Sequence, residues 1–194
     1  MLNQIEEQMK TLATLTGVML MAAAEAMAQE NANRPARRVI VSIPDRKLAV
    51  LENDRVLRTF EIAVGAPHSP SPIGVFKVVS HIENPTWYYK GKVVGPGPGN
   101  PVGTRWMGLS APGYGLHGTN VPSSIGKNAS HGCIRLRNAD VEQLFKLVAI
   151  GDQVELYGDR TDEIAQLFAP SVLPVTLVAQ TAATVSAAAS PANQ

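Results

Sequence analysis

Short alternating apolar stretches separated by turns constrain this chain more than any other feature of its sequence. Residues 39–43 alternate in this way, a turn signal at Pro44 follows, and residues 47–51 and 55–64 repeat the pattern. Such spacing predicts an antiparallel meander of strands joined by short loops. With sixteen Gly and fourteen Pro among 194 residues, the chain favours a mainly β fold with many turns. Within 55–64, one face is expected to hold Val56, Arg58, Phe60, Ile62 and Val64.

The second half of the chain continues with strands and one helix. Strands are predicted at 73–78, 105–109 and 153–157, whereas the Gly- and Pro-rich stretch 84–101 predicts a long loop around a basic turn. Asn138 is a good N-cap, and Gly151 is expected to stop the helix that follows it. The apolar face of this helix would consist of Val141, Leu144, Phe145 and Val148.

The two ends of the chain differ from its centre. Residues 1–28 resemble a secretory signal peptide, because an apolar run is followed by the small-x-small site Ala26-Met27-Ala28. A start at Met9 would give a more ordinary signal than Met1, and a packed N-terminal helix is the alternative. The apolar run is too short for a stable membrane span. Residues 29–37 are expected to be a connector, 38–158 the folded domain, and 159–194 a disordered tail with one or two helical turns at 161–168.

The residues around Cys133 carry the predicted chemistry. Cys133 is the only cysteine, so it cannot form an intramolecular disulfide. It follows Ser130, His131 and Gly132, and a second histidine, His117, precedes it by sixteen positions. A single cysteine accompanied by histidine is a candidate nucleophile and base. An imidazole that took the thiol proton would give a thiolate–imidazolium pair.

Two other interpretations use the same residues. A lone cysteine is often an inert, buried apolar residue, and His131 can be a satisfied interior histidine. A zinc site would need His117, His131, Cys133 and Asp140, but zinc ligands usually have tighter spacing in the sequence. The polar loop and the second histidine favour the nucleophile, so we expect no metal and no cofactor. A net charge of +1 with 17% charged residues gives no electrostatic case for a nucleic-acid partner.

The stretch resembles the signature of the L,D-transpeptidases, which cross-link bacterial peptidoglycan. The residues that carry the resemblance are His117-Gly118, a spacer, and Ser130-His131-Gly132-Cys133 followed by Arg135. The resemblance covers about residues 38–157, including the matches Pro72, Gly74 and Phe76. It implies the β-sandwich or flattened-barrel fold of that family, with one short α-helix after the cysteine.

Catalytic roles follow from the residues and from the resemblance together. His131 shares the strand of Cys133 and would have to bend back, whereas His117 comes from a separate strand, so His117 is assigned as the base. The Gly118 carbonyl would orient its ring. The backbone N–H groups of residues 131–133, Gly132 included, would stabilise the oxyanion. Ser130 and the His131 ring would shape the site.

Substrate-binding candidates surround these residues. Arg135 could pair with a carboxylate of the substrate, because guanidinium suits planar anions. The resemblance implies that aromatic residues such as Trp87 and Trp106 wall the substrate groove, and Asn138 is counted with them. His68 and His81 lie outside the motif and are expected in loops or on the surface.

The resemblance implies an exported cysteine enzyme of the periplasm or cell envelope. Cys133 would attack peptidoglycan tetrapeptide stems, form a thioester, and pass the acyl group to an amine. Carbapenems are expected to acylate the cysteine. Water as acceptor would make the protein an L,D-carboxypeptidase with the same residues. A non-catalytic peptidoglycan-binding module is the alternative from another class.

Overall fold

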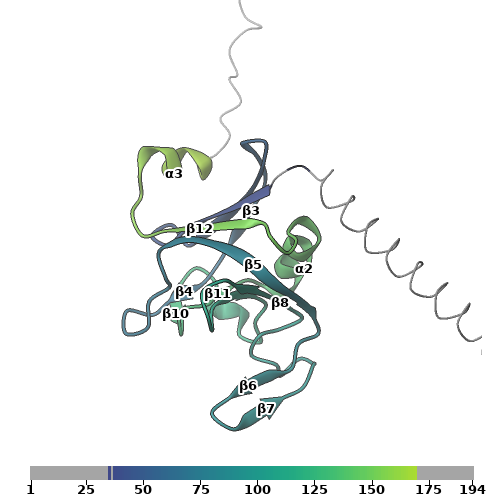
Figure 1. Cartoon of the computed structure of the whole chain (residues 1–194). Helices are drawn as coiled ribbons and strands as arrows, with labels where there is room; N and C mark the ends of the chain where they lie inside the picture. The colour runs from purple at the N-terminus through teal and green to yellow at the C-terminus, as the bar shows by residue number, and fades with distance from the viewer. Residues whose placement is uncertain (1–34, 36, 170–194) are drawn as a thin grey trace, which may run out of the picture.

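A computed structural model describes residues 35 and 37–169 of the chain. Within this part, eight strands form one sheet in the order β11-β9-β8-β5-β12-β1-β2-β3 (Figure 1). The strands are β1 (Arg37–Ser42), β2 (Lys47–Glu52), β3 (Arg55–Glu61), β5 (Gly74–Glu83), β8 (Arg105–Leu109), β9 (Gly115–His117), β11 (Ile134–Arg135) and β12 (Gln153–Tyr157). Smaller elements are β4 (Val64–Gly65) paired with β10 (Asn128–Ser130), β6 (Trp87–Tyr89) paired with β7 (Lys92–Val94), η1 (Pro122–Ser124), α2 (Asn138–Leu147) and α3 (Asp162–Leu167).

The predicted meander is confirmed in the first three strands. β1 pairs with β2 and β2 with β3, both antiparallel and both through short turns. β12, from the end of the domain, adds parallel to β1 and antiparallel to β5. The first and last strands of the domain are therefore neighbours in the middle of the sheet.

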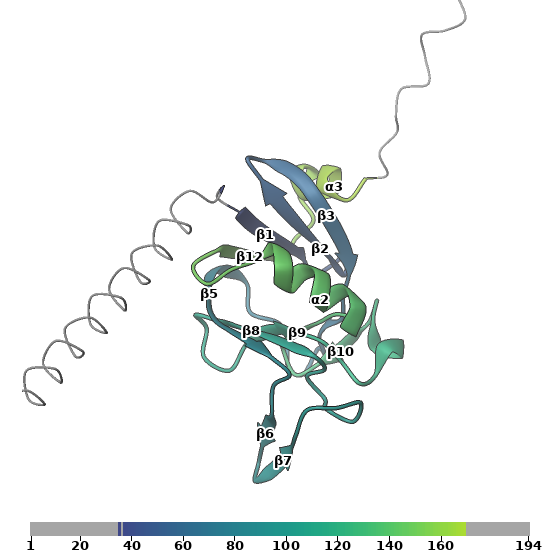
Figure 2. The same ribbon diagram turned by 90° about the vertical axis from the view of Figure 1, so that its right-hand side faces the viewer.

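The sheet curls so that strands from both of its ends share one core. This core contains Val39, Leu48 and Ile62 from the meander together with Met107 and Leu116 from β8 and β9. Helix α2 lies across this side of the sheet (Figure 2) and adds Val141 and Leu144 to the same core. Each of these side chains is fully buried, as expected for the apolar faces of packed elements. The mainly β fold expected from the sequence is confirmed.

A β-bulge interrupts the alternation predicted for 55–64. Val50 pairs with Arg58, but its neighbour Leu51 pairs with Val56, so Leu57 is an extra residue. Because an extra residue shifts the alternation of faces between the two sides of a bulge, Val56, which precedes Leu57, lies on the face opposite the core and is 42% exposed. β3 also ends at Glu61, so the predicted single strand is shorter than expected.

Helix α2 differs at both ends from the prediction. Its N-cap is Arg137, which makes no side-chain capping bond, and Asn138 is the first helical residue. The Asn138 side chain has other partners, described below. The helix ends at Leu147, before the predicted stop at Gly151, because Val148 already has an extended backbone.

Helix α3 falls inside the segment predicted to be disordered. The Thr161 side chain accepts a hydrogen bond from Ile164 N and so caps the helix. Ile164 and Phe168 are buried against Ile40 and Leu51 on the outer face of the sheet. Residues 161–168 are thus the helical turns that the sequence allowed, and packing holds them on the sheet. The predicted signal peptide and the rest of the predicted tail lie outside the described residues.

The region 84–101 also contains structure that the sequence did not predict. β6 and β7 pair as a hairpin, which projects from the body of the domain (Figure 1). Its turn is the predicted basic one, and Lys90 and Gly91 have positive φ angles of 46° and 77°, as a tight hairpin turn requires. Among the described helices, none has the length and apolar character needed to cross a membrane.

Candidate active site

Strands β9 and β11 bring His117 and Arg135 together, with Cys133 directly before β11. The two strands are parallel, with Leu116 opposite Ile134 and His117 opposite Arg135. Leu116 and Ile134 are buried in the core, at 0% and 1% exposure. Because successive side chains of a strand point to opposite faces, His117 and Arg135 share the other face. Cys133 lies directly before β11, and the charge of Arg135 acts on both His117 and Cys133. The structure thus brings together the three side chains that the sequence singled out most strongly.

Ser130 and Gly132 set the turn that presents Cys133. The buried Ser130 hydroxyl donates to the Cys133 carbonyl at 2.6 Å and accepts from the Gly132 N–H at 3.0 Å. Gly132 has a φ of +105°, a conformation that favours glycine. A Cβ at Gly132 would also lie 2.5 Å from Cε1 of Tyr114. Only glycine is therefore compatible with this turn, and Ser130 acts on the backbone.

These contacts alter the predicted set of oxyanion donors. The Gly132 N–H already has an acceptor in Ser130, so it is not available to a substrate while that bond persists. The N–H groups of His131 and Cys133 donate to no acceptor within residues 37–169. The candidate oxyanion donors are therefore two rather than three.

His117 is held in one orientation by its neighbours. Its Nδ1 lies 2.6 Å from the Gly118 carbonyl oxygen, which is the contact predicted from the sequence. Because a carbonyl can only accept, Nδ1 carries the proton and Nε2 is left as the acceptor. The ring of Trp106 stacks on the imidazole, with centroids 5.5 Å apart. His117 is thus prepared to accept a proton at Nε2.

Burial sets the protonation of both reacting groups. It lowers the pKa of His117 to about 4; the Gly118 carbonyl opposes this change and the charge of Arg135 adds to it. Burial also raises the pKa of Cys133 above its usual value, against opposing effects of the Gly115 backbone and Arg135. The thiol donates weakly to the Gly113 carbonyl, with Sγ 3.5 Å from the oxygen. These shifts favour a neutral thiol and a neutral imidazole, and not the thiolate–imidazolium pair expected from the sequence.

Arg135 brings a cation without a counter-ion to the site. Its side chain is half-buried beside Cys133, and burial lowers its pKa. Its Nε is buried without a hydrogen-bond partner, and no carboxylate of the described residues forms an ion pair with it. A buried charge is usually paired, so this guanidinium is available to an anionic ligand.

Aromatic side chains from two loops border the site. The exposed His131 ring lies 6.4 Å from Tyr89 of the hairpin and 6.5 Å from His68 of the loop before β5, centroid to centroid. Trp87 stacks on Tyr89 at 5.7 Å. The sequence proposed Trp87 but not His68, because nothing in the local pattern indicates that the hairpin and the loop meet.

Two sequence-based assignments receive a different structural role. Asn138 Oδ1 accepts from the N–H groups of Thr104 and Thr119, at 3.3 and 3.2 Å, so this oxygen is not free to bind substrate. His81, expected in a loop or on the surface, lies on strand β5, is only partly exposed, and stacks on Phe145 with centroids 3.4 Å apart. Asn138 therefore holds together the segments around β8, β9 and α2.

Sequence reasoning missed Asn100, which supports the hairpin. Asn100 is 0% exposed, and its amide donates to the carbonyls of Pro85, Val94 and Gly95 at 2.7, 3.3 and 3.1 Å. The only signal was an asparagine inside a Gly- and Pro-rich stretch.

The described part of the chain contains no group of three or more His, Cys, Asp and Glu side chains that could hold a metal ion.

Comparison with known proteins identifies relatives across most of the domain. Residues 36–156 match the family model YkuD, the L,D-transpeptidase catalytic domain. YqjB of Bacillus subtilis strain 168, whose name assigns it to the L,D-transpeptidases, is 39% identical over 134 residues, which are 66% of this chain and 76% of YqjB. A Bacillus licheniformis protein named for the same activity, YkuD, is 41% identical over 119 residues, or 61% of this chain and 64% of that protein.

Solved structures agree with the fold. The LD transpeptidase LdtMt1 in complex with imipenem has a TM-score of 0.54 and 25% identity, over 63% of this chain and 59% of that chain. An L,D-transpeptidase from Mycobacterium smegmatis has a TM-score of 0.55 at 19% identity, over 64% and 59%. The match thus spans less than two thirds of these structures, and 64% of the Bacillus licheniformis relative.

Proposed function

Because this chain belongs to the YkuD family, the L,D-transpeptidase catalytic domain, we propose that it is an exported cysteine acyltransferase acting on peptidoglycan stems. The observation that carries the proposal is the pairing of His117 opposite Arg135 on two parallel neighbouring strands, with Cys133 directly before β11 and the charge of Arg135 acting on both His117 and Cys133. A thiol, an oriented imidazole acceptor and an unpaired cation together suit acyl transfer from a peptide that has a carboxylate near the reacting bond.

The first half-reaction would form a thioester. His117 Nε2 takes the proton of Cys133 as Sγ attacks the carbonyl of the third stem residue. The N–H groups of His131 and Cys133 would stabilise the resulting oxyanion. When the tetrahedral intermediate collapses, the C–N bond breaks, His117 returns the proton to the leaving amine, and the terminal D-alanine departs.

The second half-reaction would release the acyl group to an amine. The amine of a second stem, or of an envelope protein, attacks the thioester carbonyl. His117 accepts the proton that this amine loses and passes it to the sulfur as the C–S bond breaks, which regenerates the Cys133 thiol and the neutral imidazole. Arg135 would hold a carboxylate of the donor stem by a charge-assisted hydrogen bond. Trp87 and Tyr89 on the hairpin would border the bound stem.

Neutral resting groups support this order of events. With the pKa of His117 lowered to about 4 and that of Cys133 raised, the thiolate is not stored before substrate arrives. Proton transfer is then coupled to attack, as in general-base catalysis. A mechanism that starts from a preformed thiolate–imidazolium pair would instead need a thiolate that is stabilised in the free protein.

Acylation by imipenem tests the nucleophile. We expect the purified protein to gain the mass of one imipenem-derived acyl group, and the Cys133→Ala variant to gain none, in intact-mass spectrometry.

Digests of sacculi treated with the unmodified protein should contain a new muropeptide dimer. A shortened monomer alone would indicate an L,D-carboxypeptidase, and no adduct with a folded protein would indicate a binding module.

Paired histidine variants test the base. We expect His117→Gln to lose about 100-fold or more in kcat/KM, because a general base typically contributes 10²–10⁴-fold. His131→Gln, at an exposed ring, should lose less. Muropeptide turnover is measured for both, with circular dichroism to show that each variant is folded. A larger loss in His131→Gln than in His117→Gln would reverse the assignment.

A further inference from the structure

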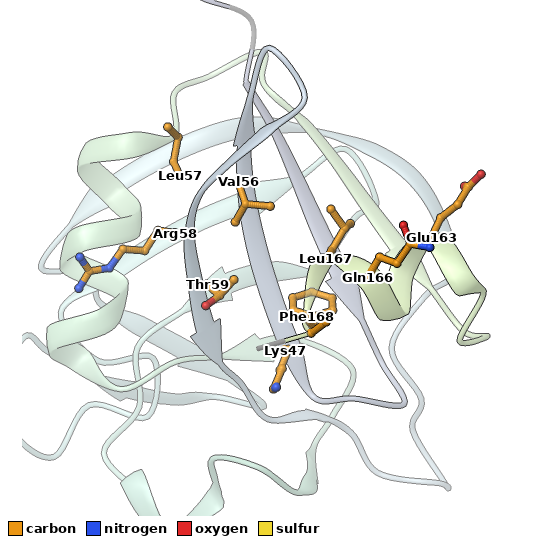
Figure 3. Close-up of a pocket in the computed structure, with 10 residues that line it drawn as sticks. Lys47, Val56, Leu57, Arg58, Thr59, Glu163, Gln166, Leu167 and Phe168 are labelled. Atoms are coloured by element: carbon orange, nitrogen blue, oxygen red, sulfur yellow. The ribbon is translucent and has the colours of Figure 1, made fainter. Parts of the chain in front are cut away.

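A hollow on the outer face of the sheet lies apart from the catalytic residues. It has a volume of about 890 Å³ and is formed between strand β3 and helix α3. Figure 3 shows its lining residues, with Val56 and Thr59 contributed by β3 and Leu167 and Phe168 by the end of α3. None of the residues assigned to catalysis or substrate binding lines it.

One wall of the hollow is the last strand of the sheet, β3. β3 is the last strand in the order of the sheet, so one side of its backbone has no strand partner. Its side chains Val56 and Leu57 are each 42% exposed. An exposed apolar edge strand is usually covered by another segment or protected by charges. Of the charged residues here, Lys47, Arg58 and Glu163 line the hollow, so apolar positions remain open between them.

The chain itself supplies a segment that fits this hollow. Ala169, the last residue described, is part of the lining, so the next residues begin at the hollow. Residues 170–194 contain no Asp, Glu, Lys or Arg, so no charge would be buried. Five apolar side chains follow within nine residues of Ala169: Val172, Leu173, Val175, Leu177 and Val178.

The length of this segment is sufficient. Four strand residues of β3, Val56 to Thr59, span roughly 13 Å at about 3.3 Å per residue. Nine residues after Ala169 can reach roughly 30 Å when extended. Pro174 cannot donate a backbone hydrogen bond, which is tolerated beside a sheet edge but not inside a sheet.

We propose that residues 172–178 of the same chain occupy the hollow and cover the free edge of β3. The apolar residues contact Val56, Leu57 and Leu167, and residues 181–194, which are mainly Ala, Thr and Ser, extend beyond it. The segment then acts as a protective cover that keeps β3 from pairing with other chains.

Two truncated proteins test this inference. A protein ending at Ala169 lacks the proposed cover, and a protein ending at Gln180 lacks only the Ala-rich residues and is the matched control. In hydrogen exchange we expect amides of β3 to exchange roughly tenfold faster or more in the shorter protein, with a Tm lowered by about 3 °C or more. The control should match the full chain. Equal exchange and Tm in all three proteins would overturn the proposal.

Leu57→Asn provides a second test that does not depend on truncation alone. Leu57 is partly exposed at a bulge, so its substitution should leave the fold intact. We expect it to lower the Tm of the full chain but not that of the protein ending at Ala169, because the two changes would remove the same contact. Equal effects in both backgrounds would contradict the proposal.

The oligomeric state shows whether the segment that covers β3 belongs to the same chain or to a second copy of it. If the cover is intramolecular, the exchange rates of β3 are independent of protein concentration and sedimentation gives a monomer. Protection that rises with concentration, together with a dimer lost on truncation to Ala169, would overturn the intramolecular form. Imipenem acylation of Cys133 should be unchanged by truncation, so the outcome is separate from that of the proposed function.

Discussion

His117 is suited to accept a proton because of one hydrogen bond and because of its burial. The Gly118 carbonyl fixes the proton on Nδ1 at 2.6 Å, and burial keeps the ring neutral by lowering its pKa to about 4. A ring with the usual pKa near 6.5 would be partly charged at slightly acidic pH. His117 therefore remains able to accept a proton over a wider range of pH than an exposed histidine.

The same burial makes folding stability depend on pH. Between about pH 6.5 and 4 the unfolded chain protonates His117 but the folded protein does not, so the free energy of unfolding should fall as pH decreases through this window. The gap between 6.5 and about 4 corresponds to at most about 3 kcal/mol. Urea unfolding from pH 7 to pH 4 measures this dependence.

A matched pair of variants isolates the contribution of His117. In His117→Gln this part of the pH dependence should disappear, while carboxylate titrations remain. His131→Gln keeps His117 in place, so it is the matched control and should retain the part of the pH dependence that belongs to His117. An unchanged slope in His117→Gln would show that the imidazole is not responsible.

At the level of elements, very short strands carry the site. β9 has three residues and β11 has two, so their own hydrogen bonds cannot hold them firmly. Ala63 adds bonds on the free side of β11, because its N–H and carbonyl pair with Arg135 at 2.9 Å each. Asn138 adds a further connection from α2 to Thr119, which directly follows Gly118, and to Thr104, which directly precedes β8. Neighbouring elements therefore position the catalytic strand.

Asn138 is predicted to position the base. Removing its oxygen in Asn138→Ala leaves the N–H groups of Thr104 and Thr119 without this acceptor, which should cost about 1–3 kcal/mol of stability. Because Thr119 directly follows Gly118, we also expect a lower kcat with little change in KM. Asn138→Asp keeps the acceptor and should recover most of the kcat. A KM effect alone would instead support substrate binding by Asn138.

On the scale of the whole molecule, one core serves both the meander and the catalytic strands. Ile62 and Leu48 at one end of the sheet pack in the same cluster as Leu116 and Ile134 at the other. The outer face of the sheet is used differently, since α3 covers Ile40 and Leu51 there. The site is thus on a rigid base while its borders, the hairpin and the loops, lie at the periphery (Figure 2).

Export is a prediction for the whole chain. We propose that residues 1–28 are removed during secretion, so protein recovered from the cell envelope of an expressing bacterium should begin at Gln29. N-terminal peptide mapping measures this. Ala28→Arg should block cleavage, because the site requires a small residue, whereas Ala24→Ser should not. Recovery from the cytoplasm with the first residues intact would contradict export.

The sequence by itself determined the chemistry and the local elements. A single cysteine, two histidines and an arginine were visible as types and spacings, and the β-rich fold followed from alternation and turns, because both depend on residues near each other in the chain. The bulge at Leu57 escaped this reasoning, since a bulge depends on the partner strand.

Only the tertiary structure decided how these residues act. The register of β9 against β11 put His117 opposite Arg135. Burial shifted the pKa values of His117 and Cys133 in the directions that favour their neutral forms, and no carboxylate of residues 37–169 forms an ion pair with Arg135. Packing also engaged Gly132 with Ser130 and turned Asn138 toward the backbone of Thr104 and Thr119. Strand register, burial and hydrogen-bond partners arise between segments far apart in the sequence, so no local pattern records them.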